Sequence, residues 1–135
     1  MLRRSVFTII TRNVSCKHPL LVIGGGSGGI GFVNNFLAKA AHKELKLKNG
    51  DIAIVEPLSV HYYQPGFTLV GGGLEKIDDL HRPTSGLIPK SVTHFPQAAV
   101  IIDPDHKSVT LTDGTVVFIS PLLTFISTFS QITTF

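Results

Sequence analysis

A glycine-rich loop carries the most specific chemistry in the sequence. The apolar run LLVI (residues 20–23) stops at GGGSGG (residues 24–29), and an apolar, alanine-rich stretch extends from residue 30 to about residue 41. This order is typical of a strand, a tight loop and a helix. Because the first backbone amides of a helix have no partner within it, such a loop offers a site for an anion such as a pyrophosphate.

Three glycines of this loop fit the pattern G-x-G-x-x-G of dinucleotide-binding proteins. Gly24 permits the tight turn, Gly26 lets the backbone approach a pyrophosphate, and Gly29 lets the helix pack closely on the strand. Ser27 adds a hydroxyl donor. Glycine clusters also form flexible linkers, so the prediction depends on the residues that come after the helix.

An acid comes after the next apolar run. Residues 52–55 (IAIV) predict a second buried strand, and Glu56 stands directly after it. A carboxylate at this place accepts hydrogen bonds from a ribose diol and repels the 2′-phosphate of NADP. Glu56 follows Gly29 by 27 residues, more than the roughly 20 expected, and an extra loop over residues 42–49 accounts for the excess. At this point both FAD and NAD remain open, because they share the loop.

The segment HYYQPGFTLVGGG (residues 61–73) predicts neither a regular strand nor a regular helix. Its aromatic rings and the amide of Gln64 suit a flat heterocycle. The alternative is that Tyr62, Tyr63 and Phe67 pack a small core and that His61 is a loop residue.

Four motifs together resemble a known family. The strings VIGGGSGGIG, IAIVEP, HYYQPGFTLVGGG and RPTSGLIPKSV are similar to the N-terminal part of mitochondrial-type sulfide:quinone oxidoreductases, within the two-dinucleotide-binding-domain flavoprotein superfamily. The resemblance runs from about residue 20 to residue 117 and favours FAD over NAD.

The resemblance implies a set of cofactor contacts. They comprise a pyrophosphate loop in which Ser27 and Gly28 make direct contacts, a ribose-binding acid, a glutamine beside the flavin, and a strand whose backbone holds the adenine. In this sequence they fall on Gly24, Gly26, Ser27, Gly28, Gly29, Glu56, Gln64, and Ala99 or Val100. It also implies a hairpin around residues 103–107, which the turn residues there and at Asp113-Gly114 predict independently.

The family reaction oxidises hydrogen sulfide at a cysteine pair and passes two electrons through FAD to ubiquinone at the inner mitochondrial membrane. This chain has one cysteine, Cys16, which matches no family cysteine. We therefore assign no catalytic residue and expect the chain to be a truncated, FAD-binding portion that is inactive alone. The alternatives are a standalone dinucleotide-binding module without redox catalysis and, less favoured, a small NAD-type reductase. The six histidines lack metal-ligand spacing, so we predict no metal site.

Charge is distributed unevenly along the 135 residues. Residues 1–43 hold six Lys or Arg and no acid, whereas the remainder holds six basic and nine acidic residues. Residues 1–19, rich in Arg and Ser and free of acids, predict a mitochondrial transit peptide; a disordered basic tail and a secretory signal are the alternatives. No nucleic-acid-binding pattern accompanies the basic residues, so we predict no nucleic-acid partner.

The elements that position these residues predict one α/β domain. We expect a Rossmann-like FAD-binding βαβ unit over residues 20–117, with a parallel sheet and an added β-hairpin, incomplete relative to the full family fold. Residues 118–135 depart from the family pattern and have no charge. We interpret them as a divergent apolar tail of a truncated or mispredicted gene product, in which Pro121 disfavours a membrane-spanning helix.

Overall fold

The computed structural model describes residues 15–119 and 124–126. The predictions for residues 1–14, and for most of the tail beyond residue 119, lie outside this part of the chain. The transit peptide and the divergent tail therefore stay predictions.

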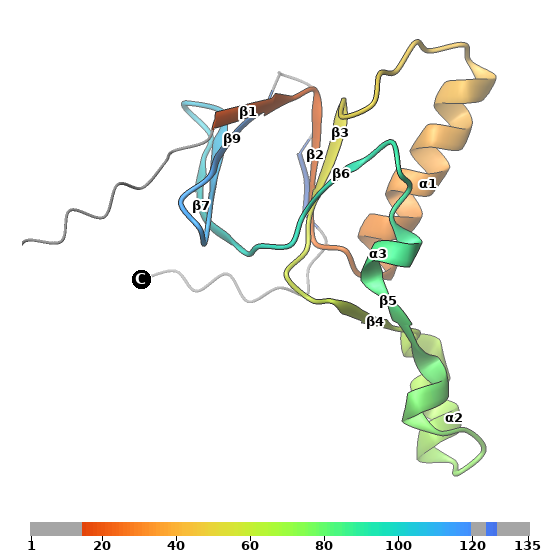
Figure 1. Cartoon of the computed structure of the whole chain (residues 1–135). Coiled ribbons are helices and arrows are strands. Elements are labelled where there is room, and N and C mark those ends of the chain that lie inside the picture. Colours follow the sequence, from red (N-terminus) through yellow and green to blue (C-terminus); the bar gives the residue numbers. More distant parts are fainter. Residues whose placement is uncertain (1–14, 120–123, 127–135) are drawn as a thin grey trace, which may run out of the picture.

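The described chain forms three layers, with the helix α1 (Ser27–His42) on one side of a central parallel sheet and a second sheet on the other side (Figure 1). The central sheet has the order β10-β2-β3-β6, and the second sheet has the order β1-β9-β8-β7. The strands of the central sheet are β2 (Leu20–Ile23), β3 (Ile52–Val55), β6 (Thr93–Phe95) and β10 (Thr124–Ile126). Those of the second sheet are β1 (Ser15–His18), β7 (Ala99–Asp103), β8 (Ser108–Leu111) and β9 (Val116–Ile119).

Strands β2 and β3 form the centre of the fold. All four residues of each strand are buried, as expected for a parallel strand that is covered on both faces. The two strands pair in register from Leu20 opposite Ile52 to Ile23 opposite Val55. Helix α1 connects them, which is the βαβ unit that the apolar runs and the glycine loop predict.

Alternate residues of these strands face two separate apolar clusters. Leu20, Val22, Ile52 and Ile54 pack with Val33 of α1, and Ile88 and Val92 complete this cluster. Leu21, Ile23, Ala53 and Val55 pack with Val109, Leu111 and Val117 of the second sheet. Because successive side chains of a strand point to opposite faces, β2 and β3 pack against α1 on one face and against the second sheet on the other.

The second sheet confirms the predicted hairpin. Strands β7 and β8 are antiparallel around the turn that comes after Asp103, and β8 and β9 are antiparallel around the turn at Asp113-Gly114. Strand β1 joins its edge by pairing in parallel with β9, from Ser15 opposite Val116 to His18 opposite Ile119. The folded unit therefore includes residues before residue 20, inside the segment predicted as a leader.

The segment predicted to lack regular structure contains short elements, so that prediction is wrong in part. Strands β4 (Val60–Tyr62) and β5 (His81–Pro83) are antiparallel and form the base of an arm that extends from the three layers (Figure 1). The arm carries the 3₁₀ helix η1 (Gln64–Gly66), the helix α2 (Phe67–Gly71) and the 3₁₀ helix η2 (Ile77–Leu80). A one-turn helix, α3 (Thr84–Leu87), comes after β5.

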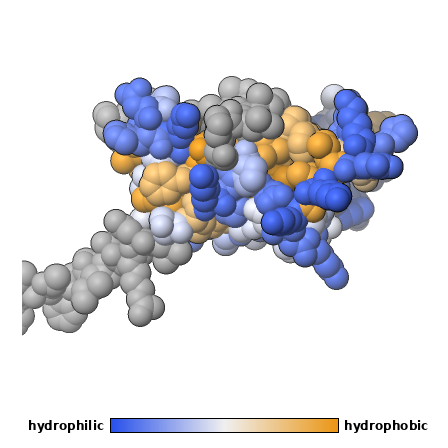
Figure 2. Space-filling view, turned by 90° about the horizontal axis from the view of Figure 1, so that it is seen from above, coloured by the Kyte–Doolittle hydropathy of each residue, from blue (hydrophilic) through white to orange (hydrophobic). Residues whose placement is uncertain are grey.

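The opposite end of the molecule carries the connection between α1 and β3. Residues 43–49 of this connection are all exposed, and Figure 2 shows hydrophilic side chains on the helix side of this view, beside apolar surface. This is the extra loop that the long spacing between Gly29 and Glu56 predicts. Among the described residues, no helix is both long and apolar enough to cross a membrane.

Candidate functional site

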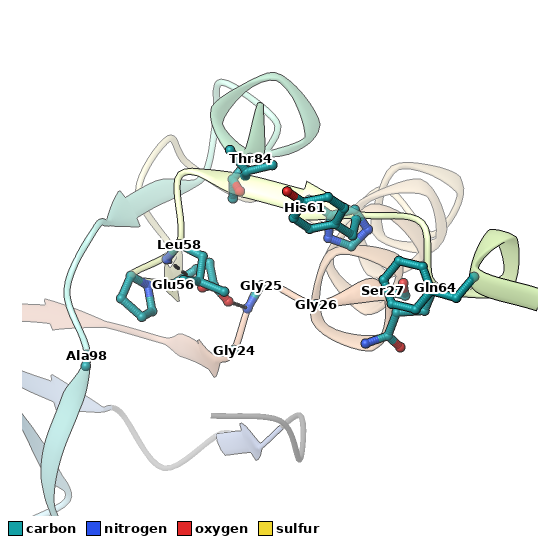
Figure 3. Close-up of a pocket in the computed structure, with 14 residues that line it drawn as sticks. Gly24, Gly25, Gly26, Ser27, Glu56, Leu58, His61, Gln64, Thr84 and Ala98 are labelled. Carbon is teal, nitrogen blue, oxygen red and sulfur yellow. Dashed lines mark hydrogen bonds between the residues drawn. The ribbon is translucent and has the colours of Figure 1, made fainter. Parts of the chain in front are cut away.

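A cavity of about 480 Å³ opens at the carboxyl ends of β2 and β3 (Figure 3). Within the sheet, β3 and β6 lie to one side of β2, whereas β10 pairs with β2 at its other edge. The strand order therefore reverses beside β2, which is where open α/β sheets bind ligands. The cavity is lined by Gly24, Gly25, Gly26, Ser27, Glu56, Pro57, Leu58, Val60, His61, Tyr62, Gln64, Phe67, Thr84 and Ala98.

The glycine loop has the geometry that its spacing predicts. Gly24 has a φ of +99°, which side chains disfavour, and its amide donates a hydrogen bond to the carbonyl oxygen of Val55 over 2.8 Å. A Cβ on Gly29 would overlap the carbonyl oxygen of Gly24. The third glycine thus lets α1 begin directly against the loop.

The start of α1 presents backbone amides to the cavity mouth. Gly26 is the N-cap and has no side-chain capping bond, and the first turn has no acidic residue. The first hydrogen bond of the helix runs from the Ile30 amide to the Gly26 carbonyl oxygen over 3.0 Å. The amides of residues 27–29 precede it and have no acceptor within the helix. Ser27 lines the cavity, whereas Gly28 is exposed beside it. This end of the helix suits an anion.

Glu56 is buried, with 8% of its surface exposed, and its carboxylate is held by two backbone amides. Gly25 N–H donates to Oε2 over 2.6 Å, and Leu58 N–H donates to Oε1 over 2.8 Å. Each carboxylate oxygen has a second lone pair, so the side chain can still accept two hydrogen bonds. A ribose diol offers two donors of that kind. The predicted acid therefore lies at the cavity and remains able to bind.

Gln64 reaches the cavity from the arm, together with His61, Tyr62 and Phe67. The rings of Tyr62 and Phe67 lie 6.3 Å apart at 51°. Tyr62, Tyr63 and Phe67 are 42%, 59% and 43% exposed, so the interpretation that they pack a small core is wrong. Two of these rings line a ligand-sized space instead.

The adenine-side prediction stays untested. Neither Ala99 nor Val100 lines the cavity, but the preceding residue, Ala98, does. Ala99 packs toward the apolar cluster between the sheets, and Val100 is 52% exposed at an irregularity in the pairing of β7 with β8. The chain therefore brings the predicted strand to the edge of the site, with a different residue at the lining.

Several lining residues were not predicted from the sequence. Leu58 and Val60 belong to this group. Thr84 lies in a segment that the family resemblance puts near the cofactor, and the pairing of β4 with β5 brings it to the cavity. The amide of Thr84 donates to the carbonyl oxygen of Ser59 over 2.9 Å. The motif RPTSGLIPKSV marks the segment, but a short pairing between residues 60–62 and 81–83 has no local signal in the sequence.

Neither a metal site nor a reactive thiol accompanies the cavity in the part of the chain that the structure describes. No group of three or more His, Cys, Asp or Glu side chains is placed to hold a metal ion in residues 15–119 and 124–126. Cys16 lies half-buried on β1 and is a free thiol outside the cavity lining.

Comparison with known proteins identifies relatives of this chain, although no family model matches it. It is 40% identical over 104 residues to the mitochondrial sulfide:quinone oxidoreductase of Dictyostelium discoideum, covering 76% of this chain and 22% of that protein. It is 37% identical over 90 residues to the corresponding protein of Schizosaccharomyces pombe, covering 61% and 20%. The chain is a relative of the mitochondrial sulfide:quinone oxidoreductases. This confirms the resemblance drawn from the four motifs.

Solved structures support the same relationship and the predicted fold class. The sulfide:quinone oxidoreductase of Aquifex aeolicus is 28% identical, with a TM-score of 0.65 over 82% of this chain and 24% of that one. A chain in the mitochondrial ATP synthase of Tetrahymena thermophila has a TM-score of 0.66 over 94% of this chain and 27% of that one, and at 15% identity it shows the fold alone. The chain thus spans about a quarter or less of the sulfide:quinone oxidoreductases it matches.

Proposed function

We propose that this chain is an FAD-binding portion of a sulfide:quinone oxidoreductase. One observation carries the proposal: residues 24–27 of the glycine loop, the Glu56 carboxylate and Gln64 line a single cavity, at the point where the strand order of the central sheet reverses. Dinucleotides bind at this place in doubly-wound folds. The relationship to sulfide:quinone oxidoreductases favours FAD among the dinucleotides.

Each part of the cavity suits a different part of FAD. The free amides of residues 27–29 and the hydroxyl of Ser27 would hold the pyrophosphate, and Gly26 leaves room for it. The remaining lone pairs of Glu56 would accept from the adenosine ribose. Gln64 and the rings of Tyr62 and Phe67 would contact the isoalloxazine from the arm. When bound, FAD supplies a two-electron acceptor.

We further propose that the chain does not oxidise sulfide by itself. Cys16 is its only cysteine, and it lies on β1 rather than at the cavity. The family reaction needs a thiol pair next to the flavin, so this chain would supply the cofactor site and not the sulfur chemistry. Hydrogen sulfide, ubiquinone and the inner mitochondrial membrane would be partners of a complete family member. The relatives are named mitochondrial, which supports a mitochondrial location for this chain.

Titration of the purified chain tests the proposal directly. We expect FAD to bind, with a decrease in flavin fluorescence that gives its dissociation constant. The dissociation constant for NAD should be at least tenfold higher. Preference for NAD or ATP over FAD would support the alternative, a standalone dinucleotide-binding module without redox chemistry. Sulfide-dependent reduction of a soluble ubiquinone analogue by the FAD-loaded chain would overturn the claim that it lacks turnover.

A further inference from the structure

Thr84 buries a hydroxyl that has no partner within the described part of the chain. The residue is 1% exposed, and its Oγ1 makes no hydrogen bond with any described group. Burying an unpaired hydroxyl costs free energy, because the group loses its hydrogen bonds to water. Native structures therefore pair nearly all such groups, and each exception needs an explanation.

The backbone around Thr84 is firmly placed. It comes after β5, which pairs with β4 from Val60 opposite Pro83, and the Thr84 amide donates to the Ser59 carbonyl oxygen over 2.9 Å. The side chain lines the cavity on the β4 side, across from Gly24, Gly25 and Gly26 (Figure 3). The unpaired hydroxyl thus belongs to a residue at the predicted binding space, not to one deep in an apolar cluster.

A hydroxyl has no packing advantage at this position. Valine has nearly the same shape as threonine and would fill the same space without a polar atom to desolvate. Rotation about the Cα–Cβ bond exchanges Oγ1 with Cγ2, so the hydroxyl can turn to a new partner without movement of the backbone. Residue type, burial and location together favour a partner that comes from the cavity.

The other buried unpaired side-chain atom in the described chain has a different setting. Nε2 of His18 belongs to a ring whose Nδ1 already lies 2.6 Å from the Gly50 carbonyl oxygen, and whose edge contacts the ring of Phe95. His18 does not line the cavity. Among the described residues, Thr84 alone combines an unpaired hydroxyl with a place at the site.

We infer that the hydroxyl of Thr84 forms a hydrogen bond with FAD bound in this cavity, to an oxygen of the part that lies against the glycine loop. This inference rests on the proposed function and adds a contact that the motifs do not assign. The hydroxyl can donate to a phosphate oxygen or accept from a sugar hydroxyl. Binding would then remove the cost of the unpaired group, so Thr84 would favour the loaded state over the empty one.

The test compares Thr84→Val and Thr84→Ser with the wild-type chain and with Thr110→Val, a matched change on β8 away from the cavity. The melting temperature of each protein is measured without ligand, and the dissociation constants for FAD and for ADP are measured by calorimetry. We expect Thr84→Val to melt at or above the wild-type temperature and to bind FAD roughly three- to tenfold more weakly. Thr84→Ser should bind within about twofold of wild type, and Thr110→Val should leave FAD affinity unchanged.

Three outcomes would overturn the inference. Unchanged FAD affinity in Thr84→Val would leave the proposed function intact and remove this contact. A melting temperature of Thr84→Val well below wild type without ligand, or failure of that variant to fold, would show that the hydroxyl has a structural partner instead. Absence of FAD binding by the wild-type chain would overturn the proposed function and the contact together. Weaker binding of both FAD and ADP by Thr84→Val would support a bond to the ADP half. Weaker binding of FAD with unchanged binding of ADP would support a bond to the flavin-side phosphate or to the sugar chain next to it.

Discussion

The backbone amide of Gly25 donates a 2.6 Å hydrogen bond to Oε2 of Glu56. This bond joins the loop after β2 to the end of β3, two segments that are 31 residues apart in the sequence. A Cβ on Gly25 would lie 2.6 Å from Cγ of Glu56, so the Glu56 side chain can lie this close to the loop only because residue 25 is a glycine. The acid predicted to bind a ribose thus also holds the loop predicted to bind the pyrophosphate.

Glu56→Gln should weaken both stability and FAD binding. Only one oxygen remains in the amide, so one of the two backbone donors, Gly25 or Leu58, loses its acceptor. Loss of a buried charge-assisted bond of this kind costs about 1.5–3 kcal/mol. We expect a decrease of that size in the free energy of unfolding, measured in urea, and at least tenfold weaker FAD binding. Glu75→Gln, an exposed acid on the arm, is the control and should change neither; equal effects of both variants would contradict a specific role for Glu56.

Gly29→Ala and Gly31→Ala should have opposite effects on stability. A Cβ on Gly29 would overlap the carbonyl oxygen of Gly24, whereas a Cβ on Gly31 meets nothing within 4 Å. Overpacking against backbone costs about 1–3 kcal/mol, and alanine in place of an exposed helical glycine stabilises by about 0.5–1 kcal/mol. Urea unfolding of both variants checks the signs. A Gly29→Ala protein as stable as wild type would show that α1 does not begin in close contact with the loop.

Tyr62→Ala and Tyr63→Ala should separate the cavity face of the arm from its outer surface. Both tyrosines are exposed, but only Tyr62 lines the cavity. We expect Tyr62→Ala to weaken FAD binding about three- to tenfold, because an aromatic pair contributes about 0.5–1.5 kcal/mol beyond its buried area. Tyr63→Ala should bind FAD as wild type does. Fluorescence titration measures both dissociation constants, and FAD affinity of Tyr62→Ala equal to that of Tyr63→Ala and wild type would exclude a contact between Tyr62 and the flavin.

Local patterns in the sequence were sufficient to predict the centre of the fold. The runs at residues 20–23 and 52–55 are apolar throughout because both faces of these strands are covered, and the glycine spacing determines where α1 begins. The position of β10 beside β2 could not be predicted, because it depends on which sheet edge is free rather than on the three residues of the strand. The pairing of β4 with β5 was missed because residues 60–62 and 81–83 are far apart in the sequence and carry no local signal for it.

The turn after β7 should make stability depend on pH. The pKa of the Asp103 carboxyl is lowered from its ordinary value of 3.8, chiefly by the hydrogen bond from the His106 amide and then by the His106 side chain. A lowered pKa in the folded state means that the ionised form stabilises the turn above pH 4 or so, and that this stabilisation is lost as the pH falls through the folded-state pKa. The Asp103 side chain is 39% exposed and its partner His106 is 79% exposed, so water screens the interaction and the effect should be small. Asp103→Asn cannot ionise, and its unfolding free energy should therefore fall less steeply than that of wild type between about pH 5 and pH 3, as measured by urea unfolding at each pH. Parallel curves for the two proteins would show that the bonds to His106 contribute nothing to the acid sensitivity of the fold.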